Sequence, residues 1–186
     1  MGARYRRNCR GHSLKSLKGL NTRPTLDKVK EAIFNVISSR ITGSAVLDLF
    51  AGTGALGIEA LSRGAETCLF NDRQRKACEI IRENLIKCRL MDGAQVFNMD
   101  ALKLLRHLQE EGLKLDLVFL DPPYESGFYV PSLEALVNMG LLGKNALVIV
   151  ETDLKNQLPE EIITLKLIKT SRYGDTLIRY YESMEE

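Results

Sequence analysis

Residues 45–57 read AVLDLFAGTGALG, an apolar run that passes directly into a glycine-rich turn. An apolar run of this length that is bounded by a turn indicates a buried strand. We predict a strand over residues 45–50 and then a helix that ends near Arg63, with Gly64 as the first residue beyond it. A strand, a glycine turn and a helix in this order are typical of α/β proteins that bind an adenosine-containing ligand.

The rest of the chain continues this alternation. Further strands are predicted over residues 67–71, 94–99, 115–120 and 146–150. Helices are predicted over residues 26–40, with Thr25 as the N-cap, and over 77–88, 101–110 and 131–139. Two strand-like runs near 162–169 and 176–182 flank Tyr173-Gly174-Asp175 and indicate an antiparallel hairpin. The expected fold is a Rossmann-like α/β fold, with a mostly parallel doubly wound sheet of about seven strands and a C-terminal antiparallel hairpin.

The composition fits one soluble domain in the cytoplasm. The chain has 186 residues, of which 45% are hydrophobic and 27% are charged, and this suffices for a single core. No apolar run reaches the roughly 18 residues that a membrane span needs, and the basic start of the chain has no apolar signal segment. The four cysteines form no CxxC pair and accompany no histidine cluster, so we expect reduced thiols and no metal site.

The charge is distributed unevenly along the chain. Residues 1–30 carry nine basic side chains and one acidic side chain, whereas the remaining residues carry 17 basic and 23 acidic side chains. A basic segment on an acidic body is typical of proteins that bind a polyanion, because each neutralised phosphate releases counterions. We divide the chain into a basic N-terminal arm, residues 1–24, and a domain that comprises residues 25–186. The alternative for the arm is a solvated tail.

The glycine pattern alone leaves two classes of ligand open. Gly52, Gly54 and Gly57 match GxGxxG, and Asp72 follows Gly52 by twenty residues, which also fits a dinucleotide site. Asp48, however, occupies a strand position where a dinucleotide site normally has an apolar residue. A carboxylate there would repel a pyrophosphate and would suit the ammonium group of a cationic ligand. The alternative interpretation of Asp48 is a capping or structural carboxylate.

A second motif, Asp121-Pro122-Pro123-Tyr124, ends the apolar run at residues 117–120. The carboxyl ends of parallel strands are where doubly wound sheets place their chemistry. The two prolines fix the backbone and supply no N–H, so their carbonyl groups can only accept hydrogen bonds. A carboxylate, a fixed carbonyl and an aromatic ring suit a planar group that bears an exocyclic amino group. An ordinary Pro-Pro turn would need neither the aspartate nor the tyrosine.

These motifs together resemble those of a known family. Residues 48–54 and 121–124 are similar to the S-adenosyl-L-methionine (AdoMet) loop and the catalytic motif of amino-directed methyltransferases. Residues 21–25, NTRPT, and residues 29–35, VKEAIFN, narrow the resemblance to the RsmD-type 16S ribosomal RNA guanine-N2 methyltransferases. The similarity covers about residues 10–183 and implies the class I AdoMet-dependent methyltransferase fold.

The resemblance implies roles for the matched residues. Asp48 and the turn would hold the methionine end of AdoMet, and Asp72 would hold its ribose, although the family usually has a glutamate near this strand end. Asp100, whose alternative role is a helix N-cap, would bind the adenine together with Ala101. The expected cofactor-binding residues are Asp48, Phe50, Ala51, Gly52, Thr53, Gly54, Asp72, Arg73, Asp100 and Ala101. The expected catalytic residues are Asp121, Pro122, Pro123 and Tyr124. The expected RNA-binding residues are Arg10, Lys15, Lys18, Asn21, Thr22, Arg23, Pro24 and Thr25.

The implied activity is methyl transfer from AdoMet to the exocyclic N2 of a guanine in 16S ribosomal RNA, the guanine that the family modifies at position 966. Asp121 and the Pro122 carbonyl would accept the two amino hydrogens and aim the nitrogen lone pair at the methyl group. Tyr124 would stack on the flipped base. The expected partner is 16S ribosomal RNA in a small-subunit assembly intermediate. The protein is expected to act as a monomer, with no metal and no membrane.

Three alternatives remain open at this level. The tetrapeptide at residues 121–124 is shared with DNA adenine methylases, so an adenine-N6 methyltransferase acting on DNA or RNA fits the same motif. The chain is short, however, for the separate target-recognition domain that such DNA enzymes generally need. An NAD-dependent oxidoreductase is disfavoured by Asp48 and by the tetrapeptide. A non-catalytic RNA-binding domain would not require an intact tetrapeptide.

Overall fold

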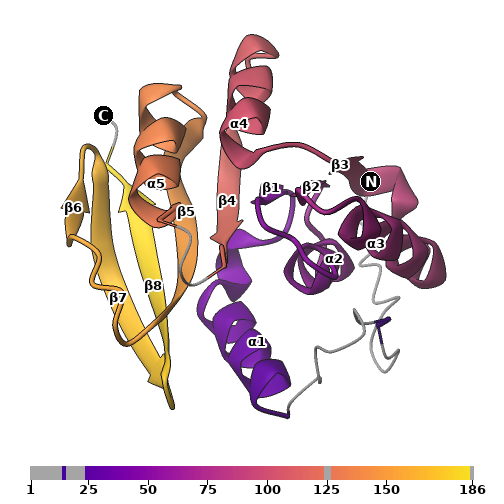
Figure 1. Ribbon diagram of the computed structural model, residues 1–186, viewed down its shortest axis with the longest axis horizontal. Coiled ribbons are helices and arrows are strands. Elements are labelled where there is room, and N and C mark those ends of the chain that lie inside the picture. Colours follow the sequence, from indigo (N-terminus) through magenta and orange to yellow (C-terminus); the bar gives the residue numbers. More distant parts are fainter. Residues whose placement is uncertain (1–13, 16–23, 124–126, 185–186) are drawn as a thin grey trace.

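Residues 14–15, 24–123 and 127–184 are described by the computed structural model. They form an eight-stranded sheet with the strand order β3-β2-β1-β4-β5-β8-β7-β6 (Figure 1). The strands are β1 (Ala45–Asp48), β2 (Thr67–Asn71), β3 (Ala94–Phe97), β4 (Leu115–Leu120), β5 (Leu142–Asp153), β6 (Glu161–Ile162), β7 (Leu165–Tyr173) and β8 (Thr176–Ser183). Strands β1 to β5 pair in parallel, whereas β8, β7 and β6 pair antiparallel with their neighbours.

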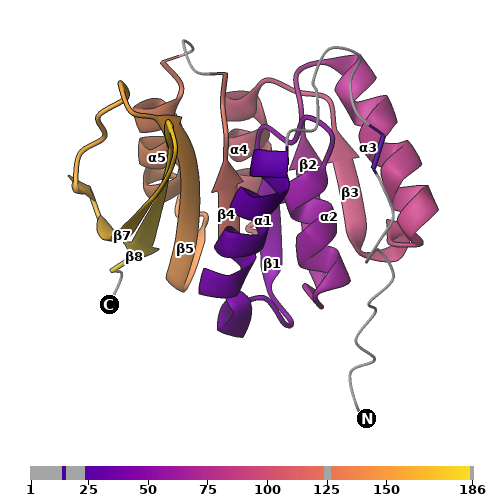
Figure 2. The ribbon, with the colours of Figure 1, turned by 90° about the horizontal axis from the view of Figure 1, so that it is seen from below.

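Helices cover both faces of this sheet (Figure 2). They are α1 (Pro24–Val36), α2 (Ala55–Ser62), α3 (Arg75–Cys88), α4 (Ala101–Glu110) and α5 (Tyr129–Asn138), with short 3-10 turns η1 (Ser38–Arg40) and η2 (Met91–Gly93). Ile33 of α1, Ile58 of α2 and Ile81 of α3 belong to the core on one face. Leu104 of α4 and Leu133 of α5 belong to the core on the other. Alternate residues of the buried strands enter one core or the other, as the period of a strand requires.

The predicted alternation of strands and helices is confirmed, with differences at the ends of several elements. β1 ends at Asp48 and β3 at Phe97, two residues before the predicted ends, because the chain there turns into the loops that follow the strands. β5 extends from Leu142 to Asp153 because its second half pairs with β8. The sheet has eight strands rather than about seven because the two residues of β6 add a short edge strand.

The first helix differs from its prediction at both ends. α1 begins at Pro24, so Thr25 lies inside the helix and is not its N-cap. Proline is tolerated as the first helical residue because the N–H at that position has no partner within the helix. α1 ends at Val36 rather than at residue 40, and residues 38–40 form the separate turn η1.

The predicted C-terminal hairpin is confirmed. β7 and β8 pair antiparallel from Tyr173 and Thr176 onward, and the turn between them passes through Gly174, whose φ of +62° favours glycine. β8 lies between β5 and β7, so the hairpin extends the sheet on the side away from β3. The parallel strands and the loops that follow them therefore remain one continuous block.

Predictions from the cysteine content are confirmed only in part. Cys68 and Cys78 are buried free thiols, as predicted. Cys88 is also buried on α3, but it is disulfide-bonded, so the prediction of reduced thiols is wrong for this residue.

In the described ranges, the structure contains no group of three or more histidine, cysteine, aspartate or glutamate side chains that could hold a metal. The helices of the same ranges include none that is long and apolar enough to cross a membrane.

Gly57 allows α2 to lie unusually close to the sheet. A Cβ atom at this position would lie 2.3 Å from Cε1 of Phe70 and 2.6 Å from Sγ of Cys68, far inside van der Waals contact. Both of these β2 side chains are fully buried and cannot move aside into solvent. The third glycine of the motif therefore sets how the helix after the turn packs on β2.

We predict that Gly57→Ala destabilises the protein by about 1–3 kcal/mol, the usual range for overpacking a core. At a solvent-exposed position within a helix, replacing glycine by alanine stabilises by about 1 kcal/mol, so the sign of the effect tests the close packing. The measurement is the free energy of unfolding from urea titration. Gly112→Ala is the control, because a Cβ atom there meets nothing within 4 Å and adds only the strain of a φ of +67°. A neutral or stabilising Gly57→Ala would contradict the packing argument.

Candidate functional site

Four predicted carboxylates lie at one edge of the sheet. Asp48 ends β1, Asp72 follows β2, Asp100 lies between β3 and α4, and Asp121 follows β4. Because these strands are parallel, their carboxyl ends meet at the same edge, toward which the arrows of β2 and β4 point in Figure 2. This carboxyl edge is where doubly wound sheets bind their ligands.

The glycine-rich turn has the backbone shape that its sequence predicts. Gly52 and Gly54 have φ angles of +55° and +78°, which favour glycine. The Ala51 N–H donates to the Asn71 carbonyl at 2.8 Å, and the Gly54 N–H donates to the Ala51 carbonyl at 2.7 Å. A Cβ atom at Gly54 would meet Ile81 at 3.2 Å, inside the core, whereas a Cβ atom at Gly52 would meet no atom within 4 Å. The turn therefore faces open space at Gly52.

Asp72 folds back onto this turn. Its Oδ2 accepts a hydrogen bond from the Gly52 N–H at 2.9 Å, and its Oδ1 accepts one from the Gln74 N–H at 2.8 Å. The spacing of twenty residues in the sequence thus corresponds to direct contact between Gly52 and Asp72. Each carboxylate oxygen can accept a second hydrogen bond, so Asp72 retains acceptor capacity for the hydroxyl groups of a ligand.

Asp48 is buried and has a structural partner. Its Oδ2 accepts a hydrogen bond from the Gly57 N–H in α2 at 3.0 Å. Burial raises the pKa of Asp48 to about 7, although the Gly57 hydrogen bond lowers it, and the neighbouring charge of Asp72 raises it further. A cation beside Asp48 would counter this effect, because an opposite charge favours the ionised carboxylate.

Asp100 caps α4, which was the alternative role considered for it. Its Oδ1 accepts hydrogen bonds from the N–H groups of Leu102 and Lys103. Both bonds use the same oxygen, so the cap leaves Oδ2 to serve as an acceptor for a ligand. Ala101 is the first residue of α4, and the N–H of a first helical residue has no partner within its helix. Capping and ligand binding are therefore compatible at this corner.

Phe50 and Arg73 follow two of these carboxylates, Asp48 and Asp72, closely along the chain. The ring of Phe50 lies 5.8 Å from the ring of Phe128, between centroids, which joins the glycine turn to the residue before α5. Arg73 is exposed, and its carbonyl accepts a hydrogen bond from Nδ2 of Asn98 at 2.9 Å. The loop after β2 is therefore tied to the loop after β3.

The second motif begins where β4 ends. Leu120 pairs with Val150 of the parallel strand β5, so the following residues, Asp121 and Glu151, come next to each other on neighbouring strands. The pKa of Asp121 is raised well above its usual value, first by burial and then by the charges of Glu151 and Asp48. Burial likewise raises the pKa of Glu151.

Three carboxyl groups at this edge, those of Asp48, Asp121 and Glu151, have raised pKa values, so a cation bound beside them would favour their ionised forms. Asp121 is exposed to solvent, yet desolvation by the surrounding protein is the main cause of its raised pKa. Asp48, Asp121 and Glu151 belong to the neighbouring strands β1, β4 and β5 or their ends. Such an arrangement can bind a cationic ligand and can accept hydrogen bonds from an amino group.

Several predicted residues cannot be placed at this edge. Pro122 is buried and Pro123 is exposed beside Asp121, but Tyr124 lies outside the described residues. Among the predicted RNA-binding residues, those outside the described ranges are Arg10, Lys18, Asn21, Thr22 and Arg23. Pro24 and Thr25 form the start of α1, and Lys15 contacts α3.

Three residues of the edge were missed by the sequence analysis. Asn71 is buried, and its Nδ2 donates to the Leu49 carbonyl at 3.1 Å. Asn84 is fully buried, and its Nδ2 donates to the Thr53 carbonyl at 3.0 Å. Glu151 comes next to Asp121. The available signal was the polar residue at an apolar position, since Asn84 interrupts the buried face of α3.

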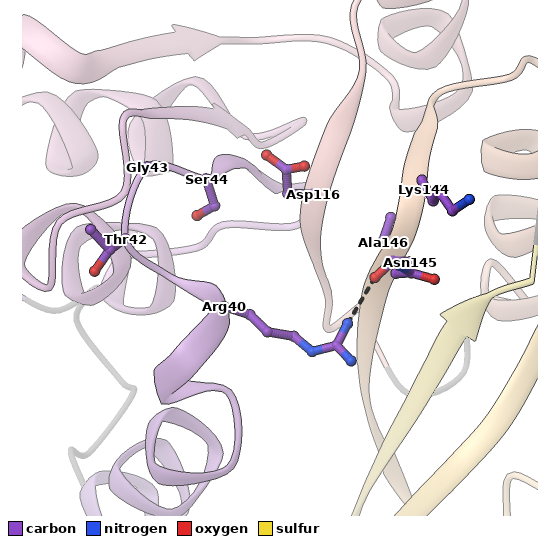
Figure 3. Close-up of a pocket in the computed structure, with 8 residues that line it drawn as sticks. All are labelled: Arg40, Thr42, Gly43, Ser44, Asp116, Lys144, Asn145 and Ala146. Carbon is purple, nitrogen blue, oxygen red and sulfur yellow. Dashed lines mark hydrogen bonds between the residues drawn. The ribbon is translucent and has the colours of Figure 1, made fainter.

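A pocket of about 330 Å³ lies away from the carboxyl edge (Figure 3). It is lined by Arg40, Thr42, Gly43, Ser44, Asp116, Lys144, Asn145 and Ala146. Arg40 Nη1 donates to the Asn145 carbonyl at 2.8 Å, and Oδ2 of Asp116 accepts from the Ala45 N–H at 2.8 Å. The first bond joins η1 to the first half of β5, and the second joins the beginnings of β1 and β4. The pocket is thus separate from the predicted site.

Comparison with known proteins reveals similarity over almost the whole chain. The family model described as conserved hypothetical protein 95 matches residues 7–182. A Haemophilus influenzae protein named ribosomal RNA small subunit methyltransferase D is 37% identical over 178 residues, which cover 94% of this chain and 90% of that protein. The Escherichia coli protein of the same name is 32% identical over 173 residues, which cover 93% and 85%. The solved structure of yhhF from Escherichia coli matches with a TM-score of 0.83 at 29% identity, and covers 95% of this chain and 94% of that chain.

We predict that the wild type becomes less stable as the pH rises, and that Asp48→Asn does not show this loss. Because the pKa is about 7 in the folded protein and 3.8 ordinarily, the folded state binds more protons between these values. The wild type therefore loses stability as the pH rises through this window, by on the order of 4 kcal/mol at most. Asparagine does not titrate and can still accept the Gly57 hydrogen bond. Urea unfolding at pH 4 and pH 8 measures the free energy of unfolding of both proteins. If the difference in this free energy between wild type and Asp48→Asn is the same at both pH values, the argument is contradicted.

Proposed function

The chain belongs to the RsmD-type methyltransferase family, described as conserved hypothetical protein 95, and we propose that it methylates the exocyclic N2 of a guanine in 16S ribosomal RNA with AdoMet as the methyl donor. One observation carries the proposal. The exposed carboxyl of Asp121 follows β4 at the same edge as the glycine turn that follows β1. Since β1 and β4 are paired, a methyl donor bound at the turn and a substrate amino group bound at Asp121 would be neighbours.

The residues of the carboxyl edge fit AdoMet. Asp48 and the turn that contains Phe50, Ala51, Gly52, Thr53 and Gly54 would hold the methionine end. Oxygens of Asp72 would accept hydrogen bonds from the ribose hydroxyls, with Arg73 beside them. Oδ2 of Asp100 would accept from the adenine amino group, to which Ala101 would add its N–H. When bound, AdoMet supplies an electrophilic methyl group on a positively charged sulfur.

The charge of the edge favours this cofactor over a dinucleotide. Burial already disfavours the ionised forms of Asp48, Asp121 and Glu151, and the charges of Glu151 and Asp48 further raise the cost of ionising Asp121. The ammonium and sulfonium groups of AdoMet would relieve this cost. A pyrophosphate would add to it. The same argument supports methyl transfer over hydride transfer from NAD.

Asp121 and Pro122 would position the substrate. The carboxylate of Asp121 and the Pro122 carbonyl would accept the two hydrogens of the guanine amino group and turn its lone pair toward the methyl group. Asp121 would accept the amino proton that the nitrogen releases on methylation, and AdoMet would supply the methyl group, with the electron pair of the broken bond left on its sulfur. A carboxylate with a raised pKa is suited to accept this proton. Pro123 would stiffen the loop, and Tyr124 would stack on the flipped base.

We assign RNA binding to the basic arm, residues 1–24, and methyl transfer to residues 25–186. Lys15 and the start of α1, with Pro24 and Thr25, are the parts of this surface that the structure describes. The start of α1 lies toward the carboxyl edge (Figure 2), which supports a path for RNA from the arm to Asp121. We assign further residues to this RNA-binding surface from the sequence alone, namely Arg10, Lys18, Asn21, Thr22 and Arg23.

The names of the curated relatives, ribosomal RNA small subunit methyltransferase D, support small-subunit RNA as the substrate. Within that RNA we propose the guanine at position 966, presented by an assembly intermediate to a cytoplasmic monomer. The choice of the guanine and of the assembly intermediate rests on the resemblance of residues 21–25 and 29–35 to the family. The tetrapeptide itself does not distinguish guanine N2 from adenine N6.

We predict that Asp121→Ala lowers the methyl-transfer rate by roughly 100-fold or more, because a positioned hydrogen-bond acceptor is lost. AdoMet affinity, measured by calorimetry, should stay within a few-fold of the wild type. Glu110→Ala is the matched control, since it removes an exposed carboxylate from the end of α4 that lies away from Asp100. Near-normal turnover in Asp121→Ala would exclude this carboxylate from the chemistry.

We predict that the purified protein transfers labelled methyl from AdoMet to small ribosomal subunits, or to their assembly intermediates, from a strain that lacks the activity. Nuclease digestion should yield N2-methylguanosine as the labelled product. Duplex DNA and the Asp121→Ala protein serve as controls, and neither reaction should give label. Label as N6-methyladenine in DNA, with none in the ribosomal RNA, would replace the proposed substrate by the adenine alternative.

A further inference from the structure

A short piece of the N-terminal arm is docked on α3. Leu14 and Lys15 are shown as the indigo segment beside α3 in Figures 1 and 2. The Lys15 N–H donates to Oδ1 of Asn84 at 2.8 Å, and Nδ2 of Asn84 donates to the Lys15 carbonyl at 3.2 Å. Leu14 packs against the core under α1, α2 and α3. The described piece of the arm is thus held by two backbone hydrogen bonds, by the apolar side chain of Leu14 and by an ion pair between Lys15 and Glu83.

The same Asn84 side chain also holds the glycine-rich turn. Its Nδ2 donates to the Thr53 carbonyl at 3.0 Å, between the two glycines with positive φ. An asparagine amide has two N–H groups and one carbonyl, and all three are used by Lys15 and Thr53 together. Asn84 is fully buried while the arm is docked, so in this state each of these groups depends on the partner that it has.

This shared amide makes the two segments interdependent. If Lys15 leaves, Asn84 retains an unsatisfied carbonyl and an unsatisfied N–H, and it is free to rotate away from Thr53. If the turn changes shape, Asn84 loses the bond that fixes its rotamer and presents a poorer partner to Lys15. Two buried polar contacts that depend on one side chain are cooperative in this way.

We propose that Asn84 is a positioning residue that couples docking of the N-terminal arm to the shape of the cofactor turn, so that AdoMet and RNA each strengthen the binding of the other. The proposal rests on the proposed function, because it takes the turn as the AdoMet site and the arm as the RNA contact. Coupling between two binding sites is reciprocal by thermodynamic necessity. A cofactor that rigidifies the turn would then hold the arm in place for RNA.

The side chain of Lys15 allows the backbone contribution to be isolated. Lys15 Nζ forms an ion pair with Glu83 at 2.7 Å, and the two side chains are 65% and 52% exposed. An ion pair this exposed contributes little to stability. Lys15→Ala therefore removes only the ion pair and retains the N–H that Asn84 accepts. Lys15→Pro removes both the ion pair and this N–H, since proline has no backbone donor.

The first test uses the full-length chain without ligand. Hydrogen–deuterium exchange of the peptide that covers residues 50–57 should be faster in Lys15→Pro than in the wild type, because the turn loses its support. Lys15→Ala should exchange like the wild type. In the Asn84→Ala background, Lys15→Pro should have no further effect, because the shared partner is already gone. Unchanged exchange in Lys15→Pro, or equal acceleration in Lys15→Ala, overturns the coupling.

The second test measures AdoMet affinity by calorimetry with and without small-subunit ribosomal RNA. Lys15→Pro should bind AdoMet about 5-fold more weakly or worse, while Lys15→Ala stays within about 2-fold of the wild type. At RNA concentrations that saturate each protein, so that the lost charge of Lys15 does not matter, the RNA should tighten AdoMet binding in the wild type and in Lys15→Ala, but not in Lys15→Pro. RNA that tightens AdoMet binding equally in all three proteins overturns the coupling. If none of them binds AdoMet while exchange still rises in Lys15→Pro, the proposed function fails and the contact between arm and turn stands.

Discussion

Parallel pairing of β1 with β2 on one side and with β4 on the other is the interaction on which the site depends. Each strand of a parallel sheet must be followed by a crossover, so the loops after the strands all emerge at one edge. The register fixes their level, since Asp48 is opposite both Phe70 and Phe119. Asp121 therefore follows β4 two positions beyond the level of Asp48. The carboxylates meet because of the backbone, against their mutual repulsion.

The repulsion has a physical consequence that links stability to binding. Burial raises the pKa of Asp48 and Asp121, and the negative charges of neighbouring carboxylates raise it further. The two cores that cover the faces of the sheet supply the stability that holds these groups in place. A cationic ligand would recover part of that electrostatic cost on binding. The features that make the edge unfavourable by itself are thus those that suit it to AdoMet.

The sequence was most informative where structure is local. Periodicity and turn residues predicted the strands, the helices and the hairpin at Gly174. The twenty-residue spacing predicted a ligand-binding role for Asp72, and the structure adds its direct contact with Gly52. Prediction was wrong where distant segments decide the outcome. The length of β5 depends on its pairing with β8, and the partner of Asn84 comes from 69 residues away along the chain. No local pattern contains such information.

Asparagine side chains form many of the hydrogen bonds that hold the loops of the edge. Asn71, at the end of β2, bonds to the loop after β1. Asn98 joins the loops after β2 and β3, and Asn84 joins the glycine turn to the arm. An amide satisfies backbone donors and acceptors without adding a charge. Lysine or arginine in these places would neutralise the carboxylates and remove the preference for a cation, whereas aspartate would add to the repulsion. Loops held by asparagine are therefore ordered in advance and leave the carboxyl groups of the edge available to the ligand.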